Sequence, residues 1–190
     1  VRFDDTYLDI INAAKIDISA GRNSDSKNAM LKKIQEMTHG TVVYDANRDE
    51  FYLKSRNSKQ EFNLVAEGIR KMALLWQLVK NGTLEKGSIL FWDEPEANIN
   101  PTYISIIVEM LLELQRQGVQ IFISTHDYLL ASYFEVKKQE RDSLVFHSLS
   151  HGEGADTIYY NKSKNFDDLK NNAIITAFNE LLNEIYNLGV

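Results

Sequence analysis

The stretch ILFWDEPEANINP, residues 89–101, carries the strongest indication of the fold of this chain. Four apolar residues lead directly into Asp93 and Glu94. A continuous apolar run of this kind is typical of a buried strand in a parallel sheet, and the sheet would fix the position of an acid at its end. The stretch alone leaves two interpretations open. The strand ends in solvated acids, or it delivers a metal-binding acid and a catalytic acid to one site.

The residues after this stretch complete a strand–helix–strand unit. Asn100 is a good N-cap and is followed by a proline, which suits the first helical position. Residues 101–117 place apolar side chains at helical spacing, and Gly118 is expected to end that helix in the left-handed conformation. The pattern therefore predicts an α/β fold with a βαβ unit, whose parallel strands span residues 88–92 and 119–125.

Ligands of such sheets bind beyond the carboxyl ends of the strands. The first strand places Asp93 and Glu94 there, and the second places His126 there. Mg²⁺ prefers one or two carboxylates together with water and phosphate oxygens, and a neighbouring acid can orient or deprotonate an attacking water. An imidazole can hydrogen-bond to a phosphate or to that water. The alternative interpretation is that these residues have no shared function, and that they are solvated acids and an ordinary loop histidine. The other histidines, His39, His147 and His151, are expected at the surface.

The helix predicted over residues 67–80 begins beside Gly68, with Arg70 and Lys71 in its first turn. Free N–H groups at a helix N-terminus bind anions, and a glycine there lets a phosphate approach closely. The alternative is a plain amphipathic helix, in which Glu67 suits the helix dipole.

The other segments are expected to surround this unit. Residues 55–63 are interpreted as a polar connector, and Gly40 is expected to end the second of two early helices. The remaining elements are helices over 3–17, 28–38 and 168–187, a hairpin within 41–54, and a terminal hairpin of 143–150 and 156–163.

Composition excludes several classes of protein. The chain has 190 residues, of which 44% are apolar and 25% charged, as in ordinary globular domains. It has no cysteine, which excludes disulfides and thiolate metal sites and fits a cytoplasmic location. No apolar run is long enough to span a membrane. The net charge of −6 disfavours nucleic-acid binding by the whole surface, although a local basic groove stays open.

Other catalytic motifs are missing from the sequence. It contains no His-x-x-x-His pair for zinc and no G-x-S-x-G nucleophile elbow. The string GTLEKGS, residues 82–88, has the glycine spacing of a phosphate-binding loop but no lysine after the second glycine. It is interpreted as a connection between a helix and a strand.

Taken in order, these motifs resemble the C-terminal half of an ABC-class ATPase head, of the SMC/RecF-like or prokaryotic "AAA family" type. Residues 89–94 resemble a Walker B motif, and PEANINP, residues 95–101, resembles a D-loop. FISTHD, residues 122–127, is similar to a switch-histidine motif, and VAEGIRKM, residues 65–72, stands where the signature motif is expected. The fold implied is an ABC-type half-domain of a P-loop NTPase. Its lid-like helical and hairpin part would be residues 1–59, and its C-terminal lobe residues 60–190.

The resemblance also implies roles for individual residues. Two heads of this family enclose two ATP molecules, so a homodimer with ATP and Mg²⁺ is expected. Asp93 would bind Mg²⁺ through water, Glu94 would be the catalytic base, and His126 would sense the γ-phosphate. The nucleotide of the partner head would meet Glu67, Gly68 and Arg70, and the D-loop residues Asn98 and Asn100 would line the dimer seam. One departure is Ala66, which replaces the signature serine.

The resemblance predicts ATP hydrolysis by the whole head, serving DNA repair or phage defence, with nucleic acid or a nuclease as a further partner. Walker A and the Q-loop are expected in an upstream part, without which this chain alone would be inactive. Because Ala66 lacks the signature hydroxyl, an ATP-gated binding or regulatory module with weak or no turnover stays as the alternative. A third interpretation is a generic α/β domain with accidental motifs.

Overall fold

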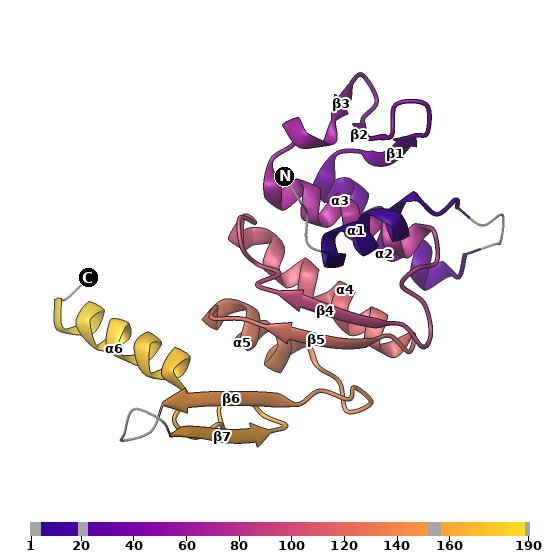
Figure 1. The fold of residues 1–190 in the computed structure, drawn as a ribbon. Coiled ribbons are helices and arrows are strands. Elements are labelled where there is room, and N and C mark those ends of the chain that lie inside the picture. Colours follow the sequence, from indigo (N-terminus) through magenta and orange to yellow (C-terminus); the bar gives the residue numbers. More distant parts are fainter. Residues whose placement is uncertain (1–4, 19–22, 152–156, 189–190) are drawn as a thin grey trace. The chain divides into compact units, whose positions relative to one another are not determined.

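The computed structural model describes residues 5–18, 23–151 and 157–188 (Figure 1). The chain divides into two compact units, residues 1–123 and residues 124–190. The fold is α/β, as predicted. The predicted helices and strands are present in the predicted order, and the structure adds one strand and one helix that were not predicted. The two units are described separately below.

The first unit contains four α-helices, two 3₁₀ turns and five strands within its described residues. The helices are α1 (Asp5–Lys15), α2 (Asp25–Thr38), α3 (Glu67–Lys80) and α4 (Ile104–Arg116), and the 3₁₀ turns are η1 (Phe62–Leu64) and η2 (Pro101–Tyr103). The strands are β1 (Thr41–Asp45), β2 (Glu50–Lys54), β3 (Lys59–Glu61), β4 (Ile89–Asp93) and β5 (Gln120–Ser124).

The predicted hairpin is confirmed, because β1 pairs antiparallel with β2. The prediction of a polar connector over residues 55–63 is wrong in part, since β3 pairs with β2 and extends the sheet. All three β3 residues are exposed. The strand therefore has no apolar alternation that a sequence pattern could reveal, and its backbone pairing alone defines it. The second helix ends at Thr38, as predicted, and its left-handed C-cap residue is His39, with φ of 54°, rather than Gly40.

The predicted βαβ unit is confirmed. Strands β4 and β5 form a parallel pair with α4 between them in the chain (Figure 1). The Asn100 side chain caps η2, which leads into α4, and Gly118 has a φ of 93° after that helix. The amide of Gly87 donates to the Gly118 carbonyl at 2.9 Å, which joins the start of β4 to the turn before β5.

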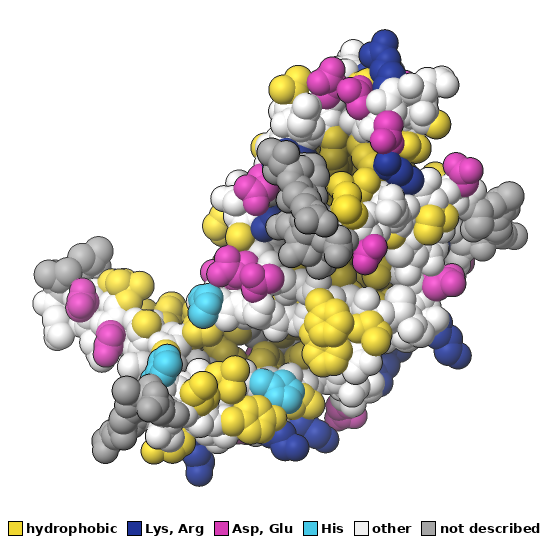
Figure 2. All heavy atoms as spheres, viewed as in Figure 1, with side chains coloured by type: hydrophobic (Ala, Val, Ile, Leu, Met, Phe, Trp, Pro, Cys, Tyr) yellow, Lys and Arg dark blue, Asp and Glu magenta, His cyan; other side chains and the backbone are white. Residues whose placement is uncertain are grey.

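The expectation that both faces of these strands are buried is wrong for this chain. Burial alternates along β4, so Leu90 and Trp92 are half-buried while Phe91 is 75% exposed. Phe91 stacks on Phe122 of β5 with ring centroids 4.9 Å apart. Figure 2 shows this apolar face of the strand pair at the surface. The sequence pattern shows that both faces of these strands are apolar. The described residues cover only one of the two faces.

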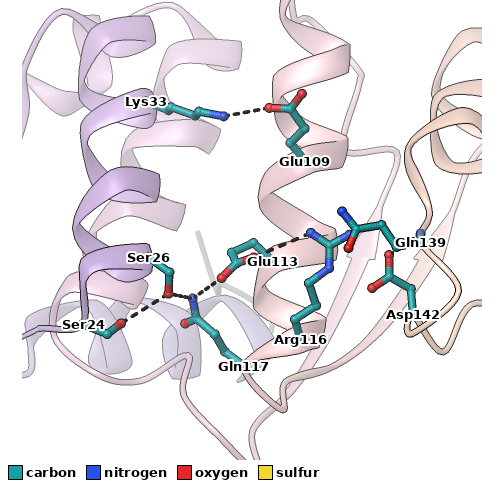
Figure 3. A network of polar contacts seen from close by, with 9 residues as sticks. All are labelled: Ser24, Ser26, Lys33, Glu109, Glu113, Arg116, Gln117, Gln139 and Asp142. Atoms are coloured by element: carbon teal, nitrogen blue, oxygen red, sulfur yellow. Dashed lines mark hydrogen bonds and ion pairs between the residues drawn. The ribbon is translucent and has the colours of Figure 1, made fainter.

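The core of the first unit lies among α2, α3 and α4, where α2 packs on both of the other helices. Its fully buried side chains include Ile34, Met72, Ile107 and Leu111. Polar contacts join α2 and α4 beside this core (Figure 3). Lys33 pairs with Glu109 at 2.8 Å, and Gln117 donates to the Ser26 hydroxyl at 3.1 Å.

The second unit contains α5 (Tyr128–Lys137), β6 (Phe146–His151), β7 (Ile158–Ser163) and α6 (Ala173–Leu188). No helix was predicted from the sequence at the position of α5. The predicted hairpin is confirmed by antiparallel pairing of β6 with β7, and residues 152–156 between them lie outside the described part. The last helix begins at Ala173, because the Asn172 side chain accepts the Ile174 amide at 3.1 Å and caps it. A small core of Ala131, Phe166 and Leu169 holds this unit together.

Candidate functional site

The candidate site begins at the carboxyl end of β4. Asp93 is the last residue of the strand, and Glu94 follows it with a left-handed φ of 43°. Both side chains are exposed, and Figure 2 shows acidic side chains at the surface there. The strand fixes the backbone of Asp93, and the left-handed residue turns the chain sharply after it. Two carboxylates are thus presented next to each other at the edge of the sheet.

The residues after β4 form what we term the acid turn, residues 94–99. The Ala97 amide donates to the Glu94 carbonyl at 3.1 Å, and the Ile99 amide donates to the Glu96 carbonyl at 3.1 Å. Asn98 has a φ of 62°, a conformation that asparagine tolerates better than most residues. The acid turn is therefore a compact double turn with two left-handed residues.

The start of α3 packs against the acid turn. Gly68 is buried, and a Cβ built on it would lie 2.1 Å from the Asn98 carbonyl oxygen and 3.1 Å from Ile99 Cγ1. A glycine is needed here because the helix approaches the backbone of its own chain. The sequence predicts that a phosphate approaches Gly68 closely, and this remains a prediction. In the structure, packing within the chain itself already requires a residue without a Cβ at this position.

Lys71 reaches the acid turn from the next turn of α3. Its Nζ lies 3.4 Å from the Glu94 carbonyl oxygen and 3.2 Å from the Ala97 carbonyl oxygen. It also lies 3.9 Å from the Glu67 carboxylate. The sequence pattern placed Lys71 only in the first turn of this helix, beside a candidate anion site. Its i,i+4 spacing from Glu67 was visible in the sequence, but its contacts with the acid turn depend on tertiary structure.

The other predicted signature residues lie at the start of α3. Glu67 is 51% exposed, and Lys71 compensates part of its charge. The Arg70 guanidinium donates to the Asn63 carbonyl at 3.5 Å. Ala66 is the N-cap, and it makes no side-chain capping bond. Their contact with a partner's nucleotide stays a prediction.

The two D-loop asparagines have different local roles. The Asn100 Oδ1 accepts the Thr102 amide at 3.0 Å and the Thr102 hydroxyl at 2.9 Å, which starts the helical segment. Asn98 is exposed and contributes its left-handed backbone to the acid turn. A position at a dimer seam remains a prediction for both.

His126 belongs to the second unit, where its side chain is exposed. It stands between two residues that form a local turn, because the Asp127 amide donates to the Thr125 hydroxyl at 2.9 Å. Asp127 then caps α5 by accepting the Leu130 amide. The backbone of His126 is thus fixed at the start of a helix. Its predicted meeting with Glu94 stays a prediction. The other three histidines are exposed, as expected.

Within residues 5–18, 23–151 and 157–188 no three His, Asp or Glu side chains gather into a metal-binding group. A Mg²⁺ ion bound by water, phosphate oxygens and one carboxylate needs no such group. The exposed carboxylate of Asp93, fixed at a strand end, is a hard oxygen donor of the kind this ion takes. The residues present therefore fit a Mg²⁺ ion that arrives with a nucleotide.

Most of the first unit, together with the start of the second, matches the model of one known protein family. A family model described as "AAA domain, putative AbiEii toxin, Type IV TA system" matches residues 10–132, more than half of the chain. The match includes α3, the acid turn, the βαβ unit and His126.

Two curated relatives are similar over a short segment. Both are energy-coupling factor transporter ATP-binding proteins EcfA. The one from Methanococcus maripaludis is 43% identical over 49 residues, and the one from Methanothermobacter thermautotrophicus is 39% identical over 49 residues. Each match takes in 26% of this chain, but only 18% and 16% of the relatives' own lengths.

Solved structures share the fold at low sequence identity. A structure from a study of ATP-driven dimerisation and DNA-stimulated activation of SMC ATPases has a TM-score of 0.50 and 8% identity, covering 96% of each chain. An Smc head bound to the C-terminal winged-helix domain of ScpA has a TM-score of 0.50 and 12% identity, covering 80% of this chain and 53% of its own. The fold is therefore that of an ABC/SMC-type ATPase head. No helix in the described residues is long and apolar enough to cross a membrane.

Proposed function

Because this chain belongs to the AAA domain family, whose fold here is that of ABC- and SMC-type ATPases, we propose that it is the C-terminal part of a head that binds and hydrolyses ATP. The observation that carries this proposal is the pair Asp93 and Glu94. They stand at the carboxyl end of the first strand of a parallel βαβ unit, with the acid turn fixed behind them. This is the edge at which such sheets bind ligands.

The two acids have separate roles in this proposal. Asp93 would hold Mg²⁺ through a bound water, and the ion would neutralise charge that develops on the phosphates. Glu94, one residue further on, would orient the attacking water and accept its proton. His126 would hydrogen-bond to the γ-phosphate as the reaction proceeds.

A second copy of the head would complete the site. Glu67, Gly68 and Arg70 at the start of α3 would face the nucleotide of the partner head, and Asn98 and Asn100 would line the seam. The SMC ATPases named above dimerise in an ATP-driven manner, which supports a homodimer here. The lysine loop that grips the phosphates would come from the part of the head outside this chain. We also propose a cytoplasmic role in DNA repair or phage defence, with nucleic acid or a nuclease as a further partner.

The test is Glu94→Gln in the full-length protein. The substitution keeps the size of the side chain and removes its basicity. We expect ATP to remain bound and kcat to fall by on the order of a hundredfold or more. Sizing with ATP and Mg²⁺ should show a trapped dimer. Unchanged turnover in this variant would exclude Glu94 as the base.

One observation favours the alternative of an ATP-gated regulatory module. Ala66 offers no hydroxyl at the start of α3. A wild-type protein that dimerises with ATP and Mg²⁺ but releases no phosphate would establish this alternative, and a hydrolysing wild type would exclude it.

A further inference from the structure

Lys71 is the charged side chain that links α3 to the residue proposed as the catalytic base. Its ammonium group contacts two carbonyl oxygens of the acid turn, those of Glu94 at 3.4 Å and Ala97 at 3.2 Å. The Lys71 side chain is only 26% exposed. Its contact with the Ala97 carbonyl is partly buried, whereas its contact with the Glu94 carbonyl is exposed. Hydrogen bonds from a charged donor are stronger than those between neutral groups.

The residue that Lys71 contacts has a costly backbone conformation. Glu94 has a φ of 43°, and Asn98 has a φ of 62°. Left-handed residues other than glycine persist where surrounding contacts over-determine them. The Glu94 carbonyl already accepts the Ala97 amide, so Lys71 adds a second donor to the same oxygen. That oxygen belongs to the residue whose side chain must meet the attacking water.

Gly68 supports the other side of the same turn. Its Cα packs against the Asn98 carbonyl, three residues before Lys71 on the same helix face. The first two turns of α3 therefore contact the acid turn at both ends, Gly68 by close packing and Lys71 by hydrogen bonds. Movement of α3 would be transmitted to the backbone of Glu94.

We propose that Lys71 is a positioning residue, which fixes the backbone of Glu94 and so aims its carboxylate at the attacking water. It acts within one head, through the carbonyls of residues 94 and 97, and needs no contact with nucleotide. This inference rests on the proposed function, because it presupposes that Glu94 acts in ATP hydrolysis. A misplacement of about 1 Å in a catalytic group can lower a rate by on the order of a hundredfold.

The experiment compares Lys71→Met and Lys71→Arg in the full-length protein with Lys80→Met, a control at the other end of α3. Methionine keeps the apolar stem and removes the donors, whereas arginine retains donors. We expect kcat of Lys71→Met to fall by on the order of tenfold to a hundredfold. KM for ATP should stay within about twofold, because binding does not use this side chain. Lys71→Arg should recover part of kcat, and Lys80→Met should equal the wild type.

A second readout does not depend on activity. Hydrogen exchange of the Ala97 and Ile99 amides should accelerate in Lys71→Met and not in Lys80→Met, because both amides close the acid turn. Unchanged exchange, or faster exchange with an unchanged kcat, overturns the role of Lys71 while an active wild type leaves the proposed function standing. A wild type without ATPase activity overturns both.

Discussion

The backbone carbonyl of Asn98 lies directly against Gly68, so closely that a Cβ on the glycine would stand 2.1 Å from the oxygen. This contact joins the start of α3 to the turn that follows β4. It places two motifs that are distant in the chain in one packed unit. The acid turn is thus shaped by a helix as well as by its own hydrogen bonds.

Gly68→Ala is expected to destabilise the protein by about 1–3 kcal/mol, because the added methyl must displace the Asn98 carbonyl or the helix. Denaturant titration measures the loss. Hydrogen exchange should also show faster exchange in residues 94–99.

The matched control is Gly87→Ala. Gly87 has a φ of 92°, but a Cβ there would meet no atom within 4 Å. It should cost about 1–2 kcal/mol of backbone strain and leave exchange in the acid turn unchanged. Equal exchange in both variants would contradict the packing argument.

Ala66→Ser is expected to stabilise the protein by about 0.5–2 kcal/mol. Ala66 is the N-cap of α3 and makes no capping bond, whereas a serine hydroxyl there can accept an amide of the first helical turn. The change in the denaturation midpoint measures this gain. Ala66→Val is the control, because valine cannot cap. A stability gain of equal size in both variants would exclude capping as the cause.

Ile107→Ala should destabilise the protein far more than Lys33→Met. Ile107 is fully buried on α4, so its truncation leaves a cavity and costs about 2–5 kcal/mol. Lys33 of α2 pairs with Glu109 of α4, but both side chains are about half exposed. Such a pair contributes about 0.2–1 kcal/mol. Denaturant titration measures the loss in free energy of unfolding for each variant. Equal losses in the two variants would be inconsistent with a core built on α4.

Stability should depend on pH through the contact of α1 with the β1–β2 turn. The pKa of Asp49 is lowered because its carboxylate accepts hydrogen bonds from the Lys15 ammonium and then from the Tyr44 hydroxyl. The pKa of Lys15 is raised, chiefly by its hydrogen bond to Asp49. The lowered pKa contributes stability above the unfolded value of about 3.9, and that contribution is lost as pH falls through the folded value. The raised pKa contributes stability below about 10.4, which is lost as pH rises through the folded value.

We therefore expect Asp49→Asn to lower Tm slightly at pH 7 and to match the wild type at a pH well below 4. Thermal melts between about pH 2 and pH 7 measure the difference in Tm, because the pKa of Asp in the unfolded chain lies within this range. Glu36→Gln serves as the control, since Glu36 is 66% exposed and 3.9 Å from Lys32. A Tm difference for Asp49→Asn that is the same at both ends of this range would contradict the linkage.

The apolar periodicity predicted most helices and strands correctly, because it reports which faces a chain can bury. The helix over residues 67–80 was predicted with the bounds it has, and the Asn100 cap with the left-handed Gly118 followed from local chemistry. β3 was missed because its three exposed residues carry no apolar pattern and only backbone pairing with β2 makes them a strand. α5 was missed as well, although Asp127 is a recognisable N-cap residue.

The sequence by itself determined the βαβ unit, the position of Asp93 and Glu94 at a strand end, and the resemblance to an ATPase head. Those features depend on neighbouring residues, whose spacing and side-chain chemistry are visible in one dimension. Only the tertiary structure decided that Gly68 packs on the Asn98 carbonyl and that Lys71 donates to the carbonyls of Glu94 and Ala97. Backbone carbonyls carry no side-chain signature, so a contact that ends on them can be found only when the fold brings the two segments together.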